Sequence, residues 1–387
     1  MNVTPSGRVL PLLGDPRLFD SSWPDRPYHS ARTAMGLREA FTWSSLDGLL
    51  NDQAIRLPAF RMARDNRLVP APSITRSDRA ESAAGKELAD PVRMTAELGR
   101  GATLVLQGVH RRCLPLRDLT RRLATEIGHA VSVNAYLTPP SAQGFGAHFD
   151  PTHAWLTQLE GTKKWRLWEY GRRPATDAPD LELVLSEGDV LWIPRGWWHE
   201  GASGERPSLH LTFAVVATTL ADVLEAVVGD LAQHAALAGE LPPKSLSDRE
   251  RAQTTVMDAT MEIGRLLANL DVEALTERVV TRRLDPFDPL PARPLAEVLG
   301  TGRDGTVHTH PEGVLYSSAD DTHVHLMTAD ADLAIPAELA SDLGDLLTRT
   351  GSFSLEEIGE PLSGKVLDQL VEARLVCSAG CPEASVR

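Results

Sequence analysis

The sequence predicts a mainly β domain of the double-sheet jelly-roll type, followed by an α-helical region and a winged-helix-like α+β module. Short segments with the patterns of strands, separated by Gly and Pro, fill residues 134–216. Apolar residues at helical spacing replace them after Val216. Four prolines within residues 284–294 then indicate a linker. We therefore expect three domains, which span residues 1–216, 217–285 and 286–387.

The predicted jelly roll consists of short strands that alternate between apolar and polar residues or are apolar throughout. They cover residues 134–138, 147–150, 154–159, 163–168, 183–185, 190–193 and 208–216. Gly161 and Gly188 mark two of the turns between them. Ahead of the strands, residues 116–127 show helical spacing, and residues 1–45 are expected to pack on the barrel as a lead-in. The polar residues 71–90 predict a loop.

The segments after Val216 divide into a helical region and a mixed module. Helical spacing predicts long helices over residues 219–237, 248–270 and 271–283. Behind the linker, strands are predicted over residues 306–310, 313–317 and 322–327, and helices over residues 337–350, from residue 354, and over residues 364–373. This mixture is typical of a winged-helix-like module. Its first helix carries Glu338, Asp342 and Asp345, so we expect contact with protein rather than with DNA.

The composition limits the partners and the compartment. The 387 residues carry a formal net charge of −14, which argues against general nucleic-acid binding because that requires a basic surface. An acidic protein suits a basic peptide or protein substrate. The amino terminus lacks a basic segment followed by an apolar one, and no stretch approaches the length of a membrane span. Three cysteines, an odd and sparse set, favour a reducing cytoplasm.

His148, Asp150 and His199 form the pattern with the clearest chemical meaning. An isolated His-x-Asp pair is usually a hydrogen-bonded surface pair. Here the two residues lie at i and i+2 of a predicted strand, so their side chains share one face, and a second histidine arrives from a later strand. Two imidazoles and one carboxylate on one side of a metal are the facial triad of non-haem Fe(II) oxygenases. The open positions let a co-substrate and O₂ bind the metal together.

Several longer motifs surround this pattern, and all of them are typical of one known protein family. They are Asn134-x-Tyr136-x-Thr138, His148-x-Asp150, Gln158-Leu159-Glu160-Gly161-x-Lys163-x-Trp165-Arg166, Gly188-Asp189-x-Leu191-x-Ile193-Pro194-Arg195-Gly196-x-x-His199 and Ser208-Leu209-His210-Leu211-Thr212. On these residues the chain resembles the JmjC-type oxygenases of the cupin superfamily, which depend on Fe(II) and 2-oxoglutarate, and within them the branch of ribosomal-protein hydroxylases. The resemblance covers most of residues 10–216.

The resemblance implies a role for seven side chains. Fe(II) ligands are implied at His148, Asp150 and His199. Lys163 is implied as the cation that binds the distal carboxylate of 2-oxoglutarate, and a dianion that chelates iron at one end does need a fixed cation at the other. Asn134, Tyr136 and His210 match positions that line the co-substrate pocket in relatives. His210 also lies in an apolar alternating strand, where a core histidine with satisfied hydrogen bonds is the alternative.

The expected function is hydroxylation of a protein or peptide side chain by an Fe(II)- and 2-oxoglutarate-dependent dioxygenase, with a ribosomal protein as the first substrate by resemblance. One alternative is a tailoring hydroxylase of a biosynthetic precursor peptide, whose leader the C-terminal module binds. Demethylation of methyl-lysine uses the same oxidant, and a non-catalytic cupin-like binding protein is the alternative from another class. The helices after residue 216 resemble the family's dimerisation region, so we expect a homodimer rather than a monomer with a helical cap.

Overall fold

The computed structural model describes residues 8–77, 87–284, 306–310, 314, 316–349, 353–354, 357–358, 362 and 364–378. Contacts between residues divide the chain into two compact units. One unit contains residues 1–216 together with residues 288–387, and the other contains residues 217–287. None of the helices that the structure describes has both the length and the apolar composition needed to cross a bilayer.

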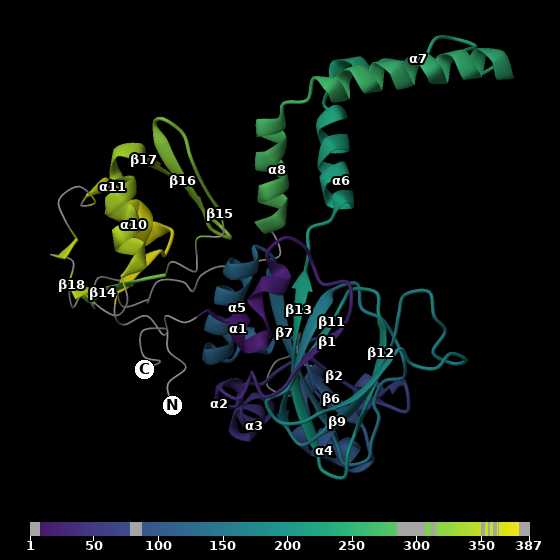
Figure 1. The fold of residues 1–387 in the computed structure, drawn as a ribbon, viewed down its shortest axis with the longest axis vertical. Helices are drawn as coiled ribbons and strands as arrows, with labels where there is room; N and C mark the ends of the chain where they lie inside the picture. The colour runs from purple at the N-terminus through teal and green to yellow at the C-terminus, as the bar shows by residue number, and fades with distance from the viewer. Residues whose placement is uncertain are drawn as a thin grey trace. The chain divides into compact units, whose positions relative to one another are not determined.

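Two antiparallel sheets form the β domain (Figure 1). The strand order is β1-β11-β8-β13-β7-β6-β2-β3 in the large sheet and β10-β9-β12 in the small one. The large sheet contains β1 (Tyr28–Ser30), β2 (Phe60–Arg64), β3 (Arg67–Leu68), β6 (Thr103–Leu106), β7 (Ala130–Thr138), β8 (His153–Glu160), β11 (Val190–Ile193) and β13 (Ser208–Val216). The small sheet contains β9 (Lys163–Trp168), β10 (Leu181–Leu185) and β12 (Trp198–Ser203). The predicted jelly roll is confirmed.

The central strands of the large sheet are buried on both faces. β13 pairs with β7 on one side and with β8 on the other, and β11 lies beyond β8. In this position even polar residues of β8 and β13, such as Gln158, His210 and Thr212, are buried. Residues of both sheets form one core cluster, which includes Leu156 and Leu191 of the large sheet and Trp165 and Leu167 of the small one. The core therefore lies between the sheets.

The N-terminal lead-in packs on the large sheet, as predicted. β1 pairs with β11, and the indole Nε1 of Trp192 donates a hydrogen bond to the carbonyl oxygen of Pro24 at 3.1 Å. The helical elements before the jelly roll are α1 (Leu10–Leu13), η1 (Pro16–Phe19), α2 (Leu37–Ala40), α3 (Trp43–Asn51), α4 (Pro91–Gly99), η4 (Val109–Arg111) and α5 (Leu114–Ile127). α5 confirms the predicted helix over residues 116–127, and it ends at Gly128 with φ 68°.

Two predictions for this domain need correction, and β12 was missed. Residues 147–150 do not form a regular strand, because only His148 makes a bridge, with His199. β12 was not predicted as an element, since its sequence mixes Trp198, His199, Glu200 and Gly201 without clear alternation. The predicted loop over residues 71–90 contains η2 (Ala71–Ser73) and a ribbon of β4 (Thr75–Arg76) and β5 (Leu88–Ala89), and its residues 78–86 lie outside the described residues.

Residues 217–287 contain the predicted long helices, α6 (Leu220–Leu231), α7 (Arg249–Ala268) and α8 (Val272–Leu284). Thr219 caps α6 in a capping box with Asp222, and the Asp248 side chain accepts a hydrogen bond at the start of α7. α6 ends six residues earlier than predicted, and η5 (Ala235–Leu237) follows as a separate turn. α6 packs against α8, where Arg282 of α8 pairs with Glu225 of α6 at 2.8 Å.

The described part of residues 306–378 has a hydrophobic core of its own, which includes Leu326, Ile335, Leu346 and Leu370. Its strands are β14 (Thr306–Thr309), β15 (Tyr316–Ala319), β16 (His323–Met327), β17 (Asp332–Pro336), β18 (Phe353–Ser354) and β19 (Val376–Ser378), and its helical elements are η7 (Ala337–Leu339), α10 (Ala340–Thr348) and α11 (Lys365–Glu372). The helix predicted from residue 354 is wrong at its start, because Ser354 ends β18. The strands β17, β18 and β19 were not predicted, and the linker over residues 284–294 lies outside the described residues after residue 284.

Candidate metal centre

Two histidines far apart in the sequence are held side by side by their backbones. The amide of His148 donates to the carbonyl of His199 at 3.1 Å, and the amide of His199 donates to the carbonyl of His148 at 2.7 Å. Residues that exchange both hydrogen bonds across an antiparallel bridge direct their side chains to one face. The two imidazole centroids are accordingly 4.5 Å apart. The pair needs no regular strand around His148, since one bridge fixes it.

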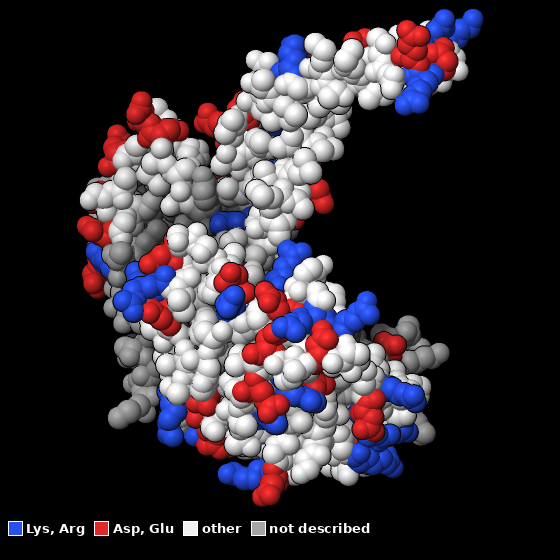
Figure 2. Space-filling model, turned by 45° about the vertical axis from the view of Figure 1, so that its right-hand side comes forward, with Lys and Arg blue, Asp and Glu red and all other residues white. Residues whose placement is uncertain are grey.

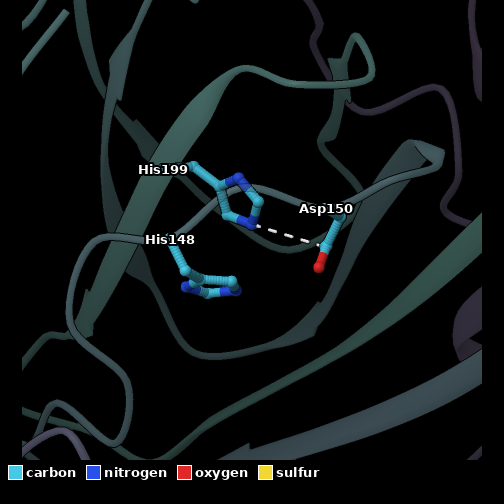
Figure 3. A group of neighbouring side chains, drawn as sticks. All are labelled: His148, Asp150 and His199. Carbon is cyan, nitrogen blue, oxygen red and sulfur yellow. Dashed lines mark ion pairs between the residues drawn. The ribbon is translucent and has the colours of Figure 1, made fainter.

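Asp150 completes a group of three ligands (Figure 3). One ligand atom each from His148, Asp150 and His199 lies within 4.8 Å of the other two, and Nε2 of His199 is 3.7 Å from Oδ2 of Asp150. The carbonyl of Asp150 accepts a hydrogen bond from the amide of Gly196 at 3.1 Å. The turn before β12 therefore holds both the carboxylate segment and, three residues later, His199.

Hydrogen bonds fix which nitrogen of each imidazole faces the site. Nδ1 of His148 is 3.0 Å from the carbonyl oxygen of Gly146, and Nδ1 of His199 is 3.1 Å from that of Trp197. A carbonyl only accepts, so each Nδ1 carries a proton and each Nε2 is the nitrogen left to face the site. Burial also lowers the pKa of His199 to about 4, which keeps its imidazole neutral at neutral pH. Two imidazoles and a carboxylate suit a divalent transition metal such as Fe(II).

A narrow, mostly enclosed pocket of about 40 Å³ lies beside the three ligands. Its walls come from both sheets and from the segment before β8. They include Thr103, Tyr136, Gly144, Phe145, Ala154, Leu156, Lys163, Trp165, Gly201, His210 and Thr212. The apolar and aromatic side chains among them exclude water, while the few polar groups are available to orient a small molecule.

Lys163 is the buried cation of this pocket. Its side chain is only 5% exposed, and Nζ donates to Oγ1 of Thr138 at 3.2 Å and lies 5.1 Å from the Trp165 ring centroid. Within the described part of the chain no carboxylate pairs with it. Burial therefore lowers its pKa to about 7. Gly201 makes room for it, since a Cβ there would lie 2.8 Å from Cε of Lys163. In such a setting the ammonium form is stabilised by an anionic ligand.

Tyr136 and His210 lie in the same pocket. Their rings stack with centroids 4.8 Å apart, and Trp165 meets the His210 ring edge-on at 5.5 Å. Burial lowers the pKa of His210 well below its usual value, so the imidazole is neutral. Burial raises the pKa of Tyr136 first, and the Asp150 carboxylate raises it further. The structure thus places His210 in the cavity wall, although it is buried like a core residue.

Asn134 lies in a different cavity. Its Oδ1 accepts a hydrogen bond from the amide of Gly108 at 3.0 Å, and its side chain lines a cleft of about 730 Å³. Asn134 also contacts the Tyr136 hydroxyl. It is therefore one step removed from the metal pocket, which it borders through Tyr136.

Sequence reasoning missed several residues of the site, most clearly Arg61 on β2. Its guanidinium lies 5.3 Å from the ring centroid of Phe145, which lines the metal pocket, and its side chain contacts the Tyr136 hydroxyl. β2 was not predicted, because its sequence Phe-Arg-Met-Ala-Arg has no clear period. The register of β2 against β6 and β7 was the signal needed to find Arg61, and a single sequence does not provide it.

Comparison with known proteins identifies the domain. Residues 112–223 match the family model described as JmjC domain. The chain is 32% identical over 136 residues to a Drosophila persimilis protein named bifunctional lysine-specific demethylase and histidyl-hydroxylase NO66. The aligned segment is 32% of this chain and 20% of that protein. Rat ribosomal oxygenase 1 is 37% identical over 132 residues, which is 30% of this chain and 22% of the relative. The chain thus spans about a fifth of the length of these relatives.

The fold also occurs in a solved bacterial structure. The Escherichia coli ribosomal oxygenase YcfD superposes with a TM-score of 0.56 over 93% of this chain and 97% of that chain, at 16% sequence identity. At this sequence identity the superposition shows a shared fold only. The family model adds sequence similarity, and the residues that it matches include all three metal ligands. The resemblance seen in the sequence is confirmed, because residues 112–223 match the JmjC domain model and the relatives over this region are ribosomal oxygenases and histidyl-hydroxylases.

Proposed function

We propose that this protein is an Fe(II)- and 2-oxoglutarate-dependent dioxygenase that hydroxylates a side chain of a protein or peptide. The observation that carries the proposal is the pairing, in one pocket, of three convergent metal ligands with the buried cation Lys163. A facial triad leaves metal positions open, and the lysine supplies the charge that the far carboxylate of a dicarboxylate needs. Neither feature alone would specify this chemistry.

Different residues of the pocket would bind the metal, bind the co-substrate and exclude water. His148, Asp150 and His199 would hold Fe(II), and Lys163, supported by Thr138, would bind the distal carboxylate of 2-oxoglutarate. When bound, iron and 2-oxoglutarate together with O₂ supply the oxidant for an unactivated C–H bond. Tyr136, Trp165 and His210 would exclude water and fix the co-substrate, and Asn134 would act through its contact with Tyr136.

The comparisons support the substrate class. The names of the relatives include ribosomal oxygenase and histidyl-hydroxylase, and one structure of YcfD is titled as a complex with cobalt and 2-oxoglutarate. We therefore place a ribosomal protein first among the substrates. Tailoring of a precursor peptide remains the second candidate, and methyl-lysine demethylation, also named for a relative, uses the same pocket chemistry. A non-catalytic cupin-like binding protein would not need the three ligands and Lys163 together.

Iron binding and co-substrate turnover test the proposal directly. Under anaerobic titration the protein should bind one Fe(II) per chain, and it should form succinate from 2-oxoglutarate in air. His199→Ala should abolish both, because two remaining ligands leave an incomplete site. His234→Ala, which removes an exposed histidine near the end of α6, is the matched control and should change neither. Unchanged iron stoichiometry in His199→Ala would remove His199 from the triad.

We further propose that residues 217–285 form the interface of a homodimer. Leu220, Leu224 and Val228 make one exposed stripe along α6 at four-residue spacing, with Leu220 88% exposed. On α7, which buries only Leu266 among its described side chains, the exposed apolar residues include Val256, Met257, Met261 and Ile263. On the face shown in Figure 2, uncharged residues cover much of these helices. Long helices with so little burial are marginal alone, and a second copy of the stripe would cover them.

We also propose that residues 286–387 form a winged-helix-like module that contacts the substrate protein. Supporting this, the described part has its own core and short three-stranded sheets beside α10 and α11. Exposed carboxylates, Glu338, Asp342 and Asp345, favour a basic protein segment over nucleic acid. Among the described residues Cys113 forms no disulfide, which supports action in the reducing cytoplasm, and cell fractionation would test this location.

Deleting residues 286–387 tests this module. The proposed metal chemistry lies before Val216, so the shortened protein should keep iron binding and uncoupled succinate formation while hydroxylation of the protein substrate falls. Mass spectrometry of the substrate, compared with succinate release, separates the two activities. Full hydroxylation by the shortened protein would refute the contact role. Loss of succinate formation as well would show that the module belongs to the catalytic fold and that the boundary near residue 286 is wrong.

A further inference from the structure

Arg61, Tyr136 and His210 form one row across the large sheet. Arg61 of β2 pairs with Val105 of β6, Val105 pairs with Tyr136 of β7, and Tyr136 pairs with His210 of β13. Directly opposed residues of antiparallel strands project from the same face. The row therefore faces the metal pocket. Val105 is short and fully buried, which lets the long Arg61 side chain reach over it to the Tyr136 hydroxyl.

Arg61 stands at the mouth of the pocket rather than in its interior. The residue is exposed, yet its guanidinium lies near the Tyr136 hydroxyl and 5.3 Å from the ring centroid of Phe145. Tyr136 and Phe145 both line the metal pocket. Among the described residues no carboxylate forms an ion pair with Arg61. Its positive charge is therefore available to a group that enters the pocket.

The neighbouring cleft continues the same face of the sheet. Asn134 and Ser132 follow Tyr136 on this face of β7, at two-residue spacing, and both line the cleft of about 730 Å³. Ala59 and Gln107, joined by a backbone hydrogen bond of 2.8 Å, continue β2 and β6 along its wall. A cleft of this size accommodates several residues of a peptide. Asn134 of this cleft neighbours Tyr136 of the metal pocket, so a target side chain that reached from the cleft to the metal would come near Tyr136 and Arg61.

The charges inside the loaded pocket are balanced without Arg61. The positive charges of Fe(II) and of a protonated Lys163 equal the negative charges of Asp150 and of the 2-oxoglutarate dianion. Arg61 adds a net positive charge at the entrance. Like charges that approach within a few ångströms repel each other even near a protein surface, and an opposite charge is attracted by the same amount.

We propose that Arg61 selects the target residue by charge, so that the pocket accepts an uncharged or carboxylate side chain and disfavours lysine and arginine. This inference rests on the proposed hydroxylase function. It narrows the substrate class, because demethylation of a cationic methyl-lysine and hydroxylation of arginine are both disfavoured by the same guanidinium. Neutral imidazole, carboxamide and carboxylate targets remain.

Matched peptides test the selection. The probes are synthetic peptides of one uncharged sequence that differ only in a central His, Asn, Asp, Lys or Arg, used well above the pKa of imidazole. Binding is followed by water-proton relaxation of the protein loaded with Mn(II) and 2-oxoglutarate, and hydroxylation by mass spectrometry. Wild-type protein should bind the His, Asn and Asp peptides more tightly than the Lys and Arg peptides. Arg61→Gln should improve the affinity for the cationic peptides relative to the Asp peptide by roughly fivefold to tenfold.

Arg67→Gln is the control, because it removes an equal charge from an exposed residue of the adjacent strand β3 and should leave the order of affinities unchanged. Three outcomes would overturn the proposed charge selection. They are an unchanged order of peptide affinities in Arg61→Gln, a preference of the wild-type protein for the Lys or Arg peptide, and binding of no peptide by either protein. Failure of the proposed function has a different signature, namely no metal binding or no succinate formation by the wild-type protein. A protein that binds metal and forms succinate but shows no charge preference among the peptides would therefore contradict the role of Arg61 alone.

Discussion

The metal pocket and the helical region hold residues in opposite and equally unusual environments. In the pocket, the cation Lys163 is 5% exposed with Thr138 as its hydrogen-bond partner. On α6, Leu220 and Leu224 are 88% and 61% exposed. Proteins normally bury leucine and expose lysine. Each region therefore invites a different partner, and the partners that we propose are an anion for the first and an apolar surface for the second.

The largest effect is expected from removing the buried cation. Lys163→Ala should leave iron binding intact but weaken the binding of 2-oxoglutarate by on the order of 2–5 kcal/mol, because one carboxylate of the co-substrate loses its charged partner in a buried site. Succinate formation against 2-oxoglutarate concentration measures the loss. Lys164→Ala, the adjacent lysine that is exposed and pairs with Glu182, is the control and should behave as wild type. A wild-type dependence in Lys163→Ala would mean that another cation binds the co-substrate.

The same lysine gives the binding a pH dependence of known sign. Burial lowers the pKa of Lys163 to about 7 in the protein without ligands, so the amine is mostly neutral above that pH. The dianion prefers the protonated amine, which raises the pKa in the complex and requires proton uptake on binding. Affinity for 2-oxoglutarate should therefore fall as the pH rises above about 7 and should level off below it. Lys163→Ala should lose this part of the pH profile.

A smaller effect is expected from the exposed stripe. Leu224→Lys places a charge in the proposed interface and should shift the protein from dimer toward monomer, by about 1.5–3 kcal/mol for the leucine that is no longer buried. Light scattering over a dilution series measures this shift. Leu68→Lys is the control, since Leu68 of β3 is 64% exposed and lies in the β domain. A wild-type protein that is monomeric at every concentration would contradict the proposed interface. The exposed stripe on α6 would then have to be covered by something other than a second copy of the chain.

The sequence predicted the parts of the site that lie within compact motifs. His148-x-Asp150 and the turn that leads to His199 carry their spacing in the chain, and the structure brings these three residues together. It also places Lys163 beside them, at the first residue of β9. These motifs could be found because each is short and contains Gly or Pro at its turn.

The remaining parts depend on register between distant strands. Alternation along β7 places Asn134 and Tyr136 on one face, but it does not reveal that Asn134 lines the larger cleft. Arg61 joins the site only because β2 and β6 extend the sheet beyond β7. In the C-terminal module, a helix was predicted to start at Ser354 from the helix-favouring residues that follow it, but Ser354 pairs with Thr306 in the sheet, and such pairing overrides local preference.

The backbone bridge between His148 and His199 links metal availability to folding. The two residues come from segments about fifty positions apart, so the unfolded chain contains no preformed site. A metal that binds only the folded chain stabilises it in proportion to the logarithm of its free concentration. Iron supply would then set the lifetime of the β domain as well as its activity. A cell short of iron would hold a smaller population of the folded protein, so chelation would lower the amount of enzyme as well as its turnover.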